Sequence, residues 1–316
     1  MNESKKNVVL LAGGIGGAKL AEGLSSIDSV SLSIIGNIAD DDVFHGLSVS
    51  PDIDTLTYTL SGQVNQTQGW GVKGDQYRAL SVLEQLGAKT WMSLGDSDFG
   101  LHIYRTERLR NGDRPSLIAK DIAAFLGVKA EIILPTDQIV RTKVKSVDGW
   151  MSFQEYFVEK KCVPEVLDIC YEGIEDAKPT DEAIRHLKSA DALIIAPSNP
   201  LLSIAPILNI RGIKGLISES NAPKLAVSPL IAGKAVKGPA IAIMNAMGMT
   251  PSSLGVAEYY KDLVDLFVID SRDANLSEDI KSLGLKVEIR STLMKDYNDK
   301  KRLSKDLISI VTSYLN

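Results

Sequence analysis

The sequence has few of the residue types that mark several common classes of protein. Its 316 residues include only two cysteines, Cys162 and Cys170, which are too few for a disulfide framework or a four-ligand zinc site. His45 and His102 have no histidine four residues away, so a histidine-based metal site is unsupported. A G-x-S-x-G elbow and a Cys-His pairing are also lacking. We expect reduced cysteines and chemistry without a covalent nucleophile.

Long apolar runs and basic clusters are scarce as well. No apolar segment reaches the roughly 18 residues that a membrane span needs. The first 24 residues superficially resemble a signal peptide, but four glycines within five residues interrupt the apolar run. Lysine and arginine are scattered and the net charge is -5, which argues against nucleic acid as a partner. We therefore expect a mature, soluble cytoplasmic chain with no membrane and no nucleic-acid partner.

What the sequence does contain is an alternation of strand and helix patterns along its whole length. Hydrophobic residues make up 44% and charged residues 24%, as in an ordinary globular protein. The strand segments, such as 7–14, 29–37, 89–96 and 191–200, are mostly continuous apolar runs, which is typical of parallel strands buried on both faces. This pattern predicts an α/β fold with a doubly wound, mainly parallel sheet in a single domain, 1–316. At about 138–172, alternating strands around an Asp148-Gly149 turn predict a β-rich insertion or lid.

The ends of the predicted strands carry glycines, small hydroxyl residues and acids, where ligands of such folds bind. "GGIGGAKL", residues 13–20, follows a strand and opens a helix, so its amides could cradle a phosphate. It matches neither the dinucleotide fingerprint nor a Walker A loop. A tight turn that allows close helix packing is the alternative. Lys19 would then be a phosphate partner or part of a solvated helix face.

Five aspartates gather between residues 39 and 55 and alternate with apolar residues. They are Asp40, Asp41, Asp42, Asp52 and Asp54. Such a cluster suits a hard cation, and Mg²⁺ commonly uses one or two carboxylates together with substrate phosphates. A solvated loop or a helix cap is the alternative interpretation.

Two later loops offer further polar groups. "PSNP", residues 197–200, holds Ser198 and Asn199 between prolines, in a fixed geometry for a base edge or a phosphate or simply as a rigid turn. Residues 228–239 add Lys234 and Lys237.

Two tryptophans, Trp70 and Trp91, could stack on a planar ring, although aromatic residues in α/β proteins are more often core. From the residues alone, the prediction is Mg²⁺-assisted chemistry on a phosphate-bearing ligand.

Several segments in the same order resemble the 2-phospho-L-lactate transferase family, from about residue 9 to residue 273. They are "LAGGIGGAKLAEGL", "GNIADDDVFHGLSVSPDIDTLTYTLSG", "GWG", "LGDSD" with "HIYRT", "PSNPLLSIAPIL", "AVSPLIAGKAVKGPA" and "GVAEYYKDLVDLFVID". The resemblance implies a Rossmann-like fold and a step of coenzyme F420 biosynthesis. In that step the terminal ribityl hydroxyl of the deazaflavin Fo attacks a guanosine-diphospho-activated phospholactate or phosphoenolpyruvate, and GMP leaves. It also implies a requirement for Mg²⁺, GDP binding and a homodimer.

The resemblance also implies roles for individual residues. Asp41 and Asp54 are expected to bind the metal or the Fo hydroxyl, and one of them to act as general base. The "PDID" segment is expected to contact Fo. Substrate binding is expected of Gly13, Gly14, Gly16, Lys19, Asn37, Asp52, Asp96, Ser198, Asn199 and Lys237.

The sequence departs from the family pattern "LGDRDLATH" at residues 94–102. Ser97 stands where the family has arginine and Leu101 where it has threonine. Because an arginine could contact a phosphate or carboxylate, the three-carbon acid that is transferred stays open. Two other functions are weighed beside the transferase. A nucleotide-sugar-binding regulator of the same superfamily would bind GDP but not Fo, and a dinucleotide-dependent oxidoreductase would need a fingerprint that the sequence lacks.

Overall fold

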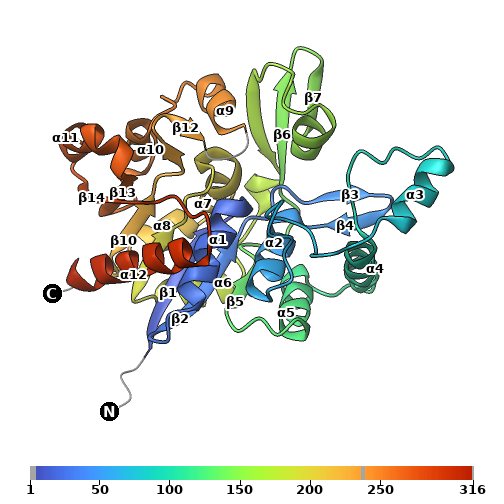
Figure 1. Ribbon diagram of the computed structural model, residues 1–316, viewed down its shortest axis with the longest axis horizontal. Helices are drawn as coiled ribbons and strands as arrows, with labels where there is room; N and C mark the ends of the chain where they lie inside the picture. The colour runs from blue at the N-terminus through green and yellow to red at the C-terminus, as the bar shows by residue number, and fades with distance from the viewer. Residues whose placement is uncertain (1–4, 236–238, 315–316) are drawn as a thin grey trace.

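The computed structural model describes residues 5–235 and 239–314, and its centre is a seven-stranded parallel sheet (Figure 1). The strand order is β14-β13-β10-β9-β1-β2-β5. The strands are β1 (Lys6–Ala12), β2 (Val30–Gly36), β5 (Glu131–Ile133), β9 (Ala192–Ile195), β10 (Lys224–Val227), β13 (Leu266–Asp270) and β14 (Lys286–Arg290). This order reverses direction between β1 and β9, as in Rossmann folds. The predicted doubly wound α/β fold class is confirmed.

Both faces of the sheet are buried, which explains the continuous apolar strands. Along β1, Val8 and Leu10 belong to one hydrophobic cluster and Val9 and Leu11 to another. The first cluster includes residues of helices α1, α2, α5 and α12, and the second includes residues of α6 to α10 on the opposite face. An alternating strand could not fill both clusters, because successive side chains point to opposite faces.

The helices are mostly short and lie on the two faces or at the edges of the sheet. They are α1 (Gly14–Ser25), α2 (Pro51–Leu60), α3 (Arg78–Gln85), α4 (Asp96–Arg110), α5 (Pro115–Phe125), α6 (Asp181–Lys188), α7 (Ala205–Asn209), α8 (Ile213–Ser218), α9 (Ala240–Ala246), α10 (Ser253–Tyr260), α11 (Ser277–Ser282) and α12 (Tyr297–Tyr314). Helix α12 packs on α1, where a side chain at Gly23 would come within 2.4 Å of the Lys300 carbonyl oxygen. That close approach requires glycine.

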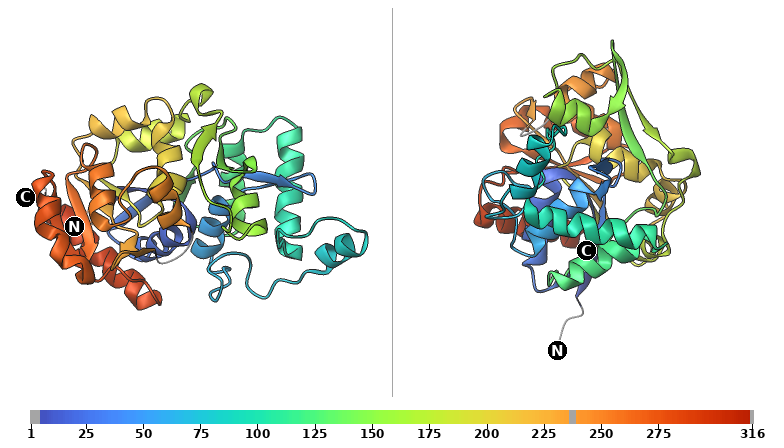
Figure 2. Two further views of the ribbon diagram at one scale, coloured as in Figure 1. Left: turned by 90° about the horizontal axis from the view of Figure 1, so that it is seen from above. Right: turned by 90° about the vertical axis from the view of Figure 1, so that its right-hand side faces the viewer.

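A lobe built from residues 42–49 and 78–110 projects to one side of the sheet (Figure 2), while α2 between them packs on α1. It contains the hairpin of β3 (Asp42–Phe44) and β4 (Leu47–Val49) with helices α3 and α4. The strand predicted at 89–96 is wrong, because this segment pairs with no strand and runs irregularly from α3 to α4. Its apolar residues instead fill a small separate cluster, in which Trp91 packs edge-on against Phe44 at 5.2 Å.

Residues 138–172 form a three-stranded antiparallel sheet beside the main one. Its strands are β6 (Arg141–Ser146), β7 (Gly149–Ser152) and β8 (Asp168–Glu172). A π-helical turn, Glu155–Glu159, follows β7 and packs Phe157 on Phe153 at a ring distance of 5.4 Å. A second small pair joins β11 (Leu230–Ile231) to β12 (Lys234–Ala235).

Cys162 and Cys170 are both free thiols. Within residues 5–235 and 239–314, no helix is both long enough and apolar enough to cross a membrane.

Candidate active site

A candidate site lies where the strand order reverses, at the carboxyl ends of β1 and β9. A cavity of about 720 Å³ opens there. One side is formed by the loops that follow the strands of the main sheet, and the other by α2, α4 and the π-helical turn after β7. This volume falls within the range of small-molecule sites, roughly 300–1,000 Å³.

The glycine turn after β1 forms the floor of the cavity. Gly14 has a φ of 63°, a conformation that favours glycine. A side-chain carbon at Gly13 would lie 2.6 Å from Asp52 Oδ2 and 2.7 Å from Ser203 Cβ, and one at Gly16 would lie 2.3 Å from the Pro197 carbonyl oxygen. The predicted glycines therefore serve close packing and at the same time line the cavity at the start of α1.

The loop after β9 is tied directly to this turn. Ser198 Oγ donates to the Gly13 carbonyl oxygen at 2.7 Å and accepts from the Gly13 N–H at 3.3 Å. Asn199 Oδ1 accepts from the N–H groups of Leu201 and Leu202, at 3.0 and 3.1 Å. Both residues line the cavity. Ser198 thus fixes the two loops of the switch point relative to each other.

Asp40 and Asp52 bring two carboxylates to the same part of the cavity. Both are more than 90% buried and line it. Burial, and then the charges of Asp52 and Asp41, raise the pKa of Asp40 well above its usual value, and burial raises the pKa of Asp52. Asn37 lies behind the wall and donates from Nδ2 to Asp52 Oδ2 at 2.9 Å. Asn37, predicted to bind substrate, therefore holds Asp52.

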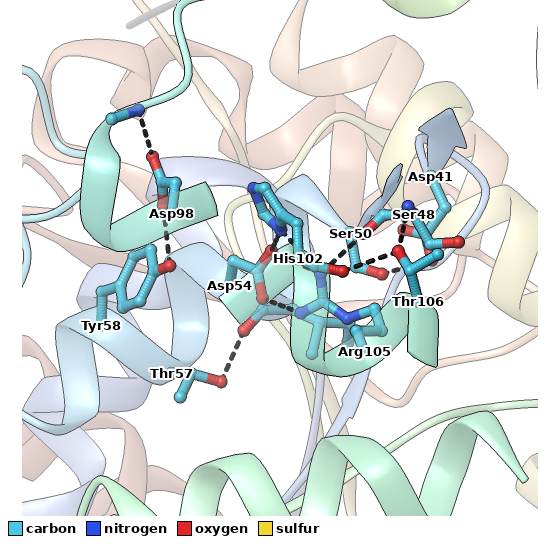
Figure 3. Close-up of polar contacts among 12 residues, drawn as sticks. Asp41, Ser48, Ser50, Asp54, Thr57, Tyr58, Asp98, His102, Arg105 and Thr106 are labelled. Atoms are coloured by element: carbon cyan, nitrogen blue, oxygen red, sulfur yellow. Dashed lines mark hydrogen bonds and ion pairs between the residues drawn. The ribbon is translucent and has the colours of Figure 1, made fainter. Parts of the chain in front are cut away.

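Asp41 and Asp54, the two carboxylates expected to be catalytic, have different surroundings. Asp41 does not line the cavity; its Oδ2 accepts from Ser50 Oγ at 2.8 Å, and burial raises its pKa well above the usual value. Asp54 does line the cavity and pairs with the buried Arg105 through both oxygens, as Figure 3 shows. A bidentate pair of this kind fixes the orientation of Asp54.

Helices α2 and α4 supply a polar wall that faces the sheet loops. Tyr58 donates to Asp98 Oδ1 at 2.7 Å, and burial raises the pKa of Asp98 to about 6. Burial lowers the pKa of His102 to about 4, and its Nδ1 lies 3.1 Å from Nη1 of Arg105. Tyr58, Asp98 and His102 all line the cavity. Figure 3 shows how they project from α2 and α4.

The remaining cation and aromatic candidates separate into two groups. Lys19 lines the cavity and donates from Nζ to the Met294 carbonyl oxygen at 2.8 Å, and Trp70 lines it with 40% of its surface exposed. Trp91 lies instead in the lobe cluster. Lys234 is exposed on β12, and Lys237 falls outside the described residues.

Asp96 and Ser97 lie at the start of α4, away from the cavity lining. Asp96 accepts from the backbone N–H groups of Arg78 and Ala79 and so caps α3. Ser97 is exposed, and its N–H donates to Asp75 at 2.9 Å. Neither Asp96 nor Ser97 lines the cavity, and the substrate role expected of Asp96 stays a prediction.

Several carboxylates at or near the cavity could serve as oxygen ligands for Mg²⁺. Across the described part of the chain, no three His, Cys, Asp or Glu side chains form a ready-made metal cage. Mg²⁺ often needs only one or two carboxylates besides phosphates and water. Asp40 and Asp52 fit, since they repel each other at the cavity wall and Asp40 Oδ1 has no partner in residues 5–235 and 239–314. Asp54 fits less well because Arg105 engages both of its oxygens.

Tyr58, Asp98, His102 and Arg105 were not predicted as site residues. A signal for them exists in the sequence, since Asp98, His102 and Arg105 follow the i, i+4, i+7 spacing of one helix face. Asp54 and Tyr58 are likewise four residues apart on α2. The sequence analysis predicts a strand over 89–96 and no helix at 51–60, so this helical spacing was missed.

Comparison with known proteins gives matches over nearly the whole chain. The family model described as "2-phospho-L-lactate transferase CofD" matches residues 8–313. Curated relatives include 2-phospho-L-lactate transferases of Methanopyrus kandleri, 39% identical with 96% of this chain and 97% of the relative covered, and of Methanocaldococcus jannaschii, 37% identical with 97% and 98% covered.

A solved structure agrees with the fold. A member of the UPF0052 family from Bacillus halodurans superposes with a TM-score of 0.65 and 18% sequence identity, over 96% of this chain and 99% of that chain. At this identity the likeness concerns the arrangement of strands and helices alone.

Proposed function

The chain belongs to the 2-phospho-L-lactate transferase CofD family, and from that premise we propose the reaction it catalyses. The donor is a guanosine-diphospho-activated phospholactate or phosphoenolpyruvate, and the acceptor is the deazaflavin Fo. The terminal ribityl hydroxyl of Fo forms a new O–P bond to the phosphorus that bears the three-carbon acid. The bond from this phosphorus to the bridging oxygen breaks, GMP leaves with that oxygen, and the hydroxyl proton is released.

The observation that carries this proposal is that one cavity contains groups suited to a diphosphate and groups suited to a planar ring with a hydroxylated chain. The glycine turn at Gly13 and Gly14 and the loop at Ser198 offer backbone groups at a helix start, which suits a diphosphate. The lining also includes Trp70 and a buried polar wall on α2 and α4, which suits a planar ring with a hydroxylated chain. A two-substrate transferase needs both in reach of each other.

The residues of the chain act mainly by positioning and by charge. Asp40 and Asp52 would hold Mg²⁺, which when bound neutralises the negative charge of the diphosphate. Asn37 orients Asp52, and Ser198 keeps the two phosphate-side loops together. Asp54, fixed by Arg105, faces the cavity as the carboxylate that we propose to receive the hydroxyl proton. Asp41 would support this region from behind the wall through Ser50.

A mass-spectrometric assay tests the reaction. Purified protein, Fo and Mg²⁺ are combined with phospholactate, phosphoenolpyruvate or 3-phosphoglycerate, each activated in a separate tube by GTP and a guanylyltransferase. A metal-dependent product containing Fo and one acid phosphate supports the transferase and names its donor. If every tube stays blank while an authentic family enzyme works alongside, the proposal is wrong. GDP binding without Fo binding would then favour the regulator.

Asp54→Asn tests the catalytic carboxylate. We expect kcat to fall by at least about 100-fold, with GDP binding retained, because a positioned general base contributes at least that much. Asp148→Asn, an exposed aspartate in the turn between β6 and β7, serves as the matched control and is expected to behave as the wild type. Unchanged turnover of Asp54→Asn would remove this role.

We also propose a homodimer that works in the cytoplasm. Exposed apolar side chains on and beside the lobe helix α3, namely Tyr77, Val82 and Leu86, support self-association. Light scattering at several protein concentrations measures the assembly directly, and a monomer at every concentration would exclude the dimer.

A further inference from the structure

One hydrogen-bond acceptor and one donor face the cavity from the same side of α4. Asp98 and His102 are four residues apart, so both project from one face of the helix. Both line the cavity, yet Asp98 is only 8% and His102 only 1% exposed. Polar groups so well buried need partners inside the cavity rather than in bulk water.

The protonation of the His102 ring follows from its neighbours. Nδ1 lies 3.1 Å from Nη1 of Arg105, and a guanidinium has only N–H donors. The nearer carboxylate oxygen, Asp54 Oδ2, is 3.8 Å from Nδ1, too far for a hydrogen bond. Nδ1 is therefore an acceptor, and the proton of the neutral ring is on Nε2.

Nε2 points away from Arg105, as Figure 3 shows, and in the described part of the chain no residue accepts a hydrogen bond from it. Among the described residues, Nε2 is not one of the fully buried polar atoms that lack a partner, so it is open to the cavity that His102 lines. A ligand oxygen in the cavity can therefore accept its hydrogen bond.

Asp98 is held in place but keeps spare acceptor capacity. Tyr58 donates to Oδ1 at 2.7 Å, and the Gly95 N–H donates to Oδ2 at 3.3 Å. A carboxylate has about four acceptor positions, so two remain. The charges that act on Asp98 from neighbouring elements come from Asp54 and Asp75.

We propose that Asp98 and His102 recognise the hydroxyl groups of the polyol chain of the acceptor. His102 Nε2–H donates to a hydroxyl oxygen, and that hydroxyl or its neighbour donates to Asp98. A hydroxyl is both donor and acceptor, so a chain of hydroxyls complements this pair, whereas a carboxylate or phosphate would be repelled by Asp98. The inference rests on the proposed function, since it assigns Asp98 and His102 to binding the polyol chain of the proposed acceptor.

The position of Asp98 and His102 indicates that they bind the hydroxyl groups of the acceptor chain and not those of the nucleotide ribose. Asp98 and His102 lie on the α2 and α4 side of the cavity, together with Tyr58 of α2. The loops that follow the strands of the main sheet, where nucleotides bind in doubly wound folds, form the other side.

The test compares two acceptors that share a reactive terminal hydroxyl. One is Fo, and the other is the same deazaflavin with a 2-hydroxyethyl chain, which lacks the inner hydroxyls. We expect His102→Ala and Asp98→Asn to raise KM for Fo about tenfold while leaving KM for the short-chain acceptor and for the donor nearly unchanged. The wild-type preference for Fo is then lost.

His102→Gln is the conservative variant, because its amide oxygen can accept from Arg105 while its NH₂ group donates to the ligand. It should recover part of the preference for Fo. Ile103→Ala, on the exposed side of the same helix, is the matched control. A merely structural role of the pair would lower kcat for both acceptors equally, and that result would overturn the inference, as would a rise in the donor KM alone.

Binding without turnover separates this inference from the proposed function. Fo fluorescence is titrated with wild-type protein and with His102→Ala in the absence of donor. Weaker Fo binding by the variant supports the pair even if the transfer assay stays blank. Equal binding contradicts the pair even if the wild type transfers the acid phosphate.

Discussion

The two sides of the cavity are built in opposite ways. The sheet side uses backbone: Gly13, Gly14 and the Ser198 loop bring main-chain groups together at the ends of β1 and β9. The lobe side uses side chains: Asp54, Arg105 and their neighbours form a buried polar network between α2 and α4. A backbone site is damaged by added atoms, and a side-chain network is damaged by atoms removed. The two sides should therefore respond to different substitutions, the sheet side to a larger residue and the lobe side to a truncated one.

The largest expected effect is on the lobe side, from Arg105→Met. Removing the guanidinium leaves Asp54 buried without its partner, which should lower the free energy of unfolding by about 3–5 kcal/mol. Urea unfolding followed by circular dichroism measures this. Arg108→Met, on the same helix but with partly exposed partners, should lose much less, because solvent screens exposed ion pairs. Equal decreases in the free energy of unfolding for the two variants would mean that the buried Asp54–Arg105 pair stabilises the fold no more than the exposed pairs of Arg108.

Gly13→Ala breaks the sheet side by adding one methyl group. Asp52 Oδ2 and Ser203 Cβ lie where that group must fit, so both must move. We expect kcat/KM to fall about 100-fold, because small displacements of positioning groups have effects of that order. Gly100→Ala on α4 has no atoms within 4 Å of the added carbon and should keep its activity. Steady-state kinetics on both variants decides the point.

The pH dependence of acceptor binding sharpens the description of the lobe side. Because the pKa of Asp98 is raised to about 6, the carboxylate is ionised above that pH and becomes protonated below it. His102 remains neutral down to about pH 4. KM for Fo in the wild type should therefore rise as the pH falls through 6 and level off about tenfold higher, near the value for Asp98→Asn, whose own KM should not change over this range. Parallel pH profiles for the two proteins would contradict this.

The smallest expected effect comes from Trp70, an aromatic side chain of the cavity lining. Trp70→Leu should raise KM for Fo about fivefold, since a stacking contact is worth about 1 kcal/mol. Trp150→Leu, half-exposed on β7 away from the cavity lining, should leave KM unchanged. The same KM for both variants would exclude stacking by Trp70.

Sequence reasoning succeeded where the signal is local. The apolar runs of β1, β2 and β9 and the glycine turn between β1 and α1 are contiguous in the chain, so each could be recognised without its neighbours. It failed at 89–96, where the chain has the composition of a strand but no partner strand. Whether an apolar segment joins a sheet depends on which edge it can reach.

The functional residues divide in the same way. The sequence by itself determined the fold class, the glycine turn and the presence of an acidic cluster, because these depend on residue type and short spacing. Only the tertiary structure decided that Asp40 and Asp52 face the cavity while Asp41 lies behind its wall. The tertiary structure also placed Asp98 and His102 of α4 next to Asp54 and Tyr58 of α2. Burial and pairing of charges arise from contacts between segments some 40 to 50 residues apart, as between Asp54 and Arg105, and no local pattern encodes them.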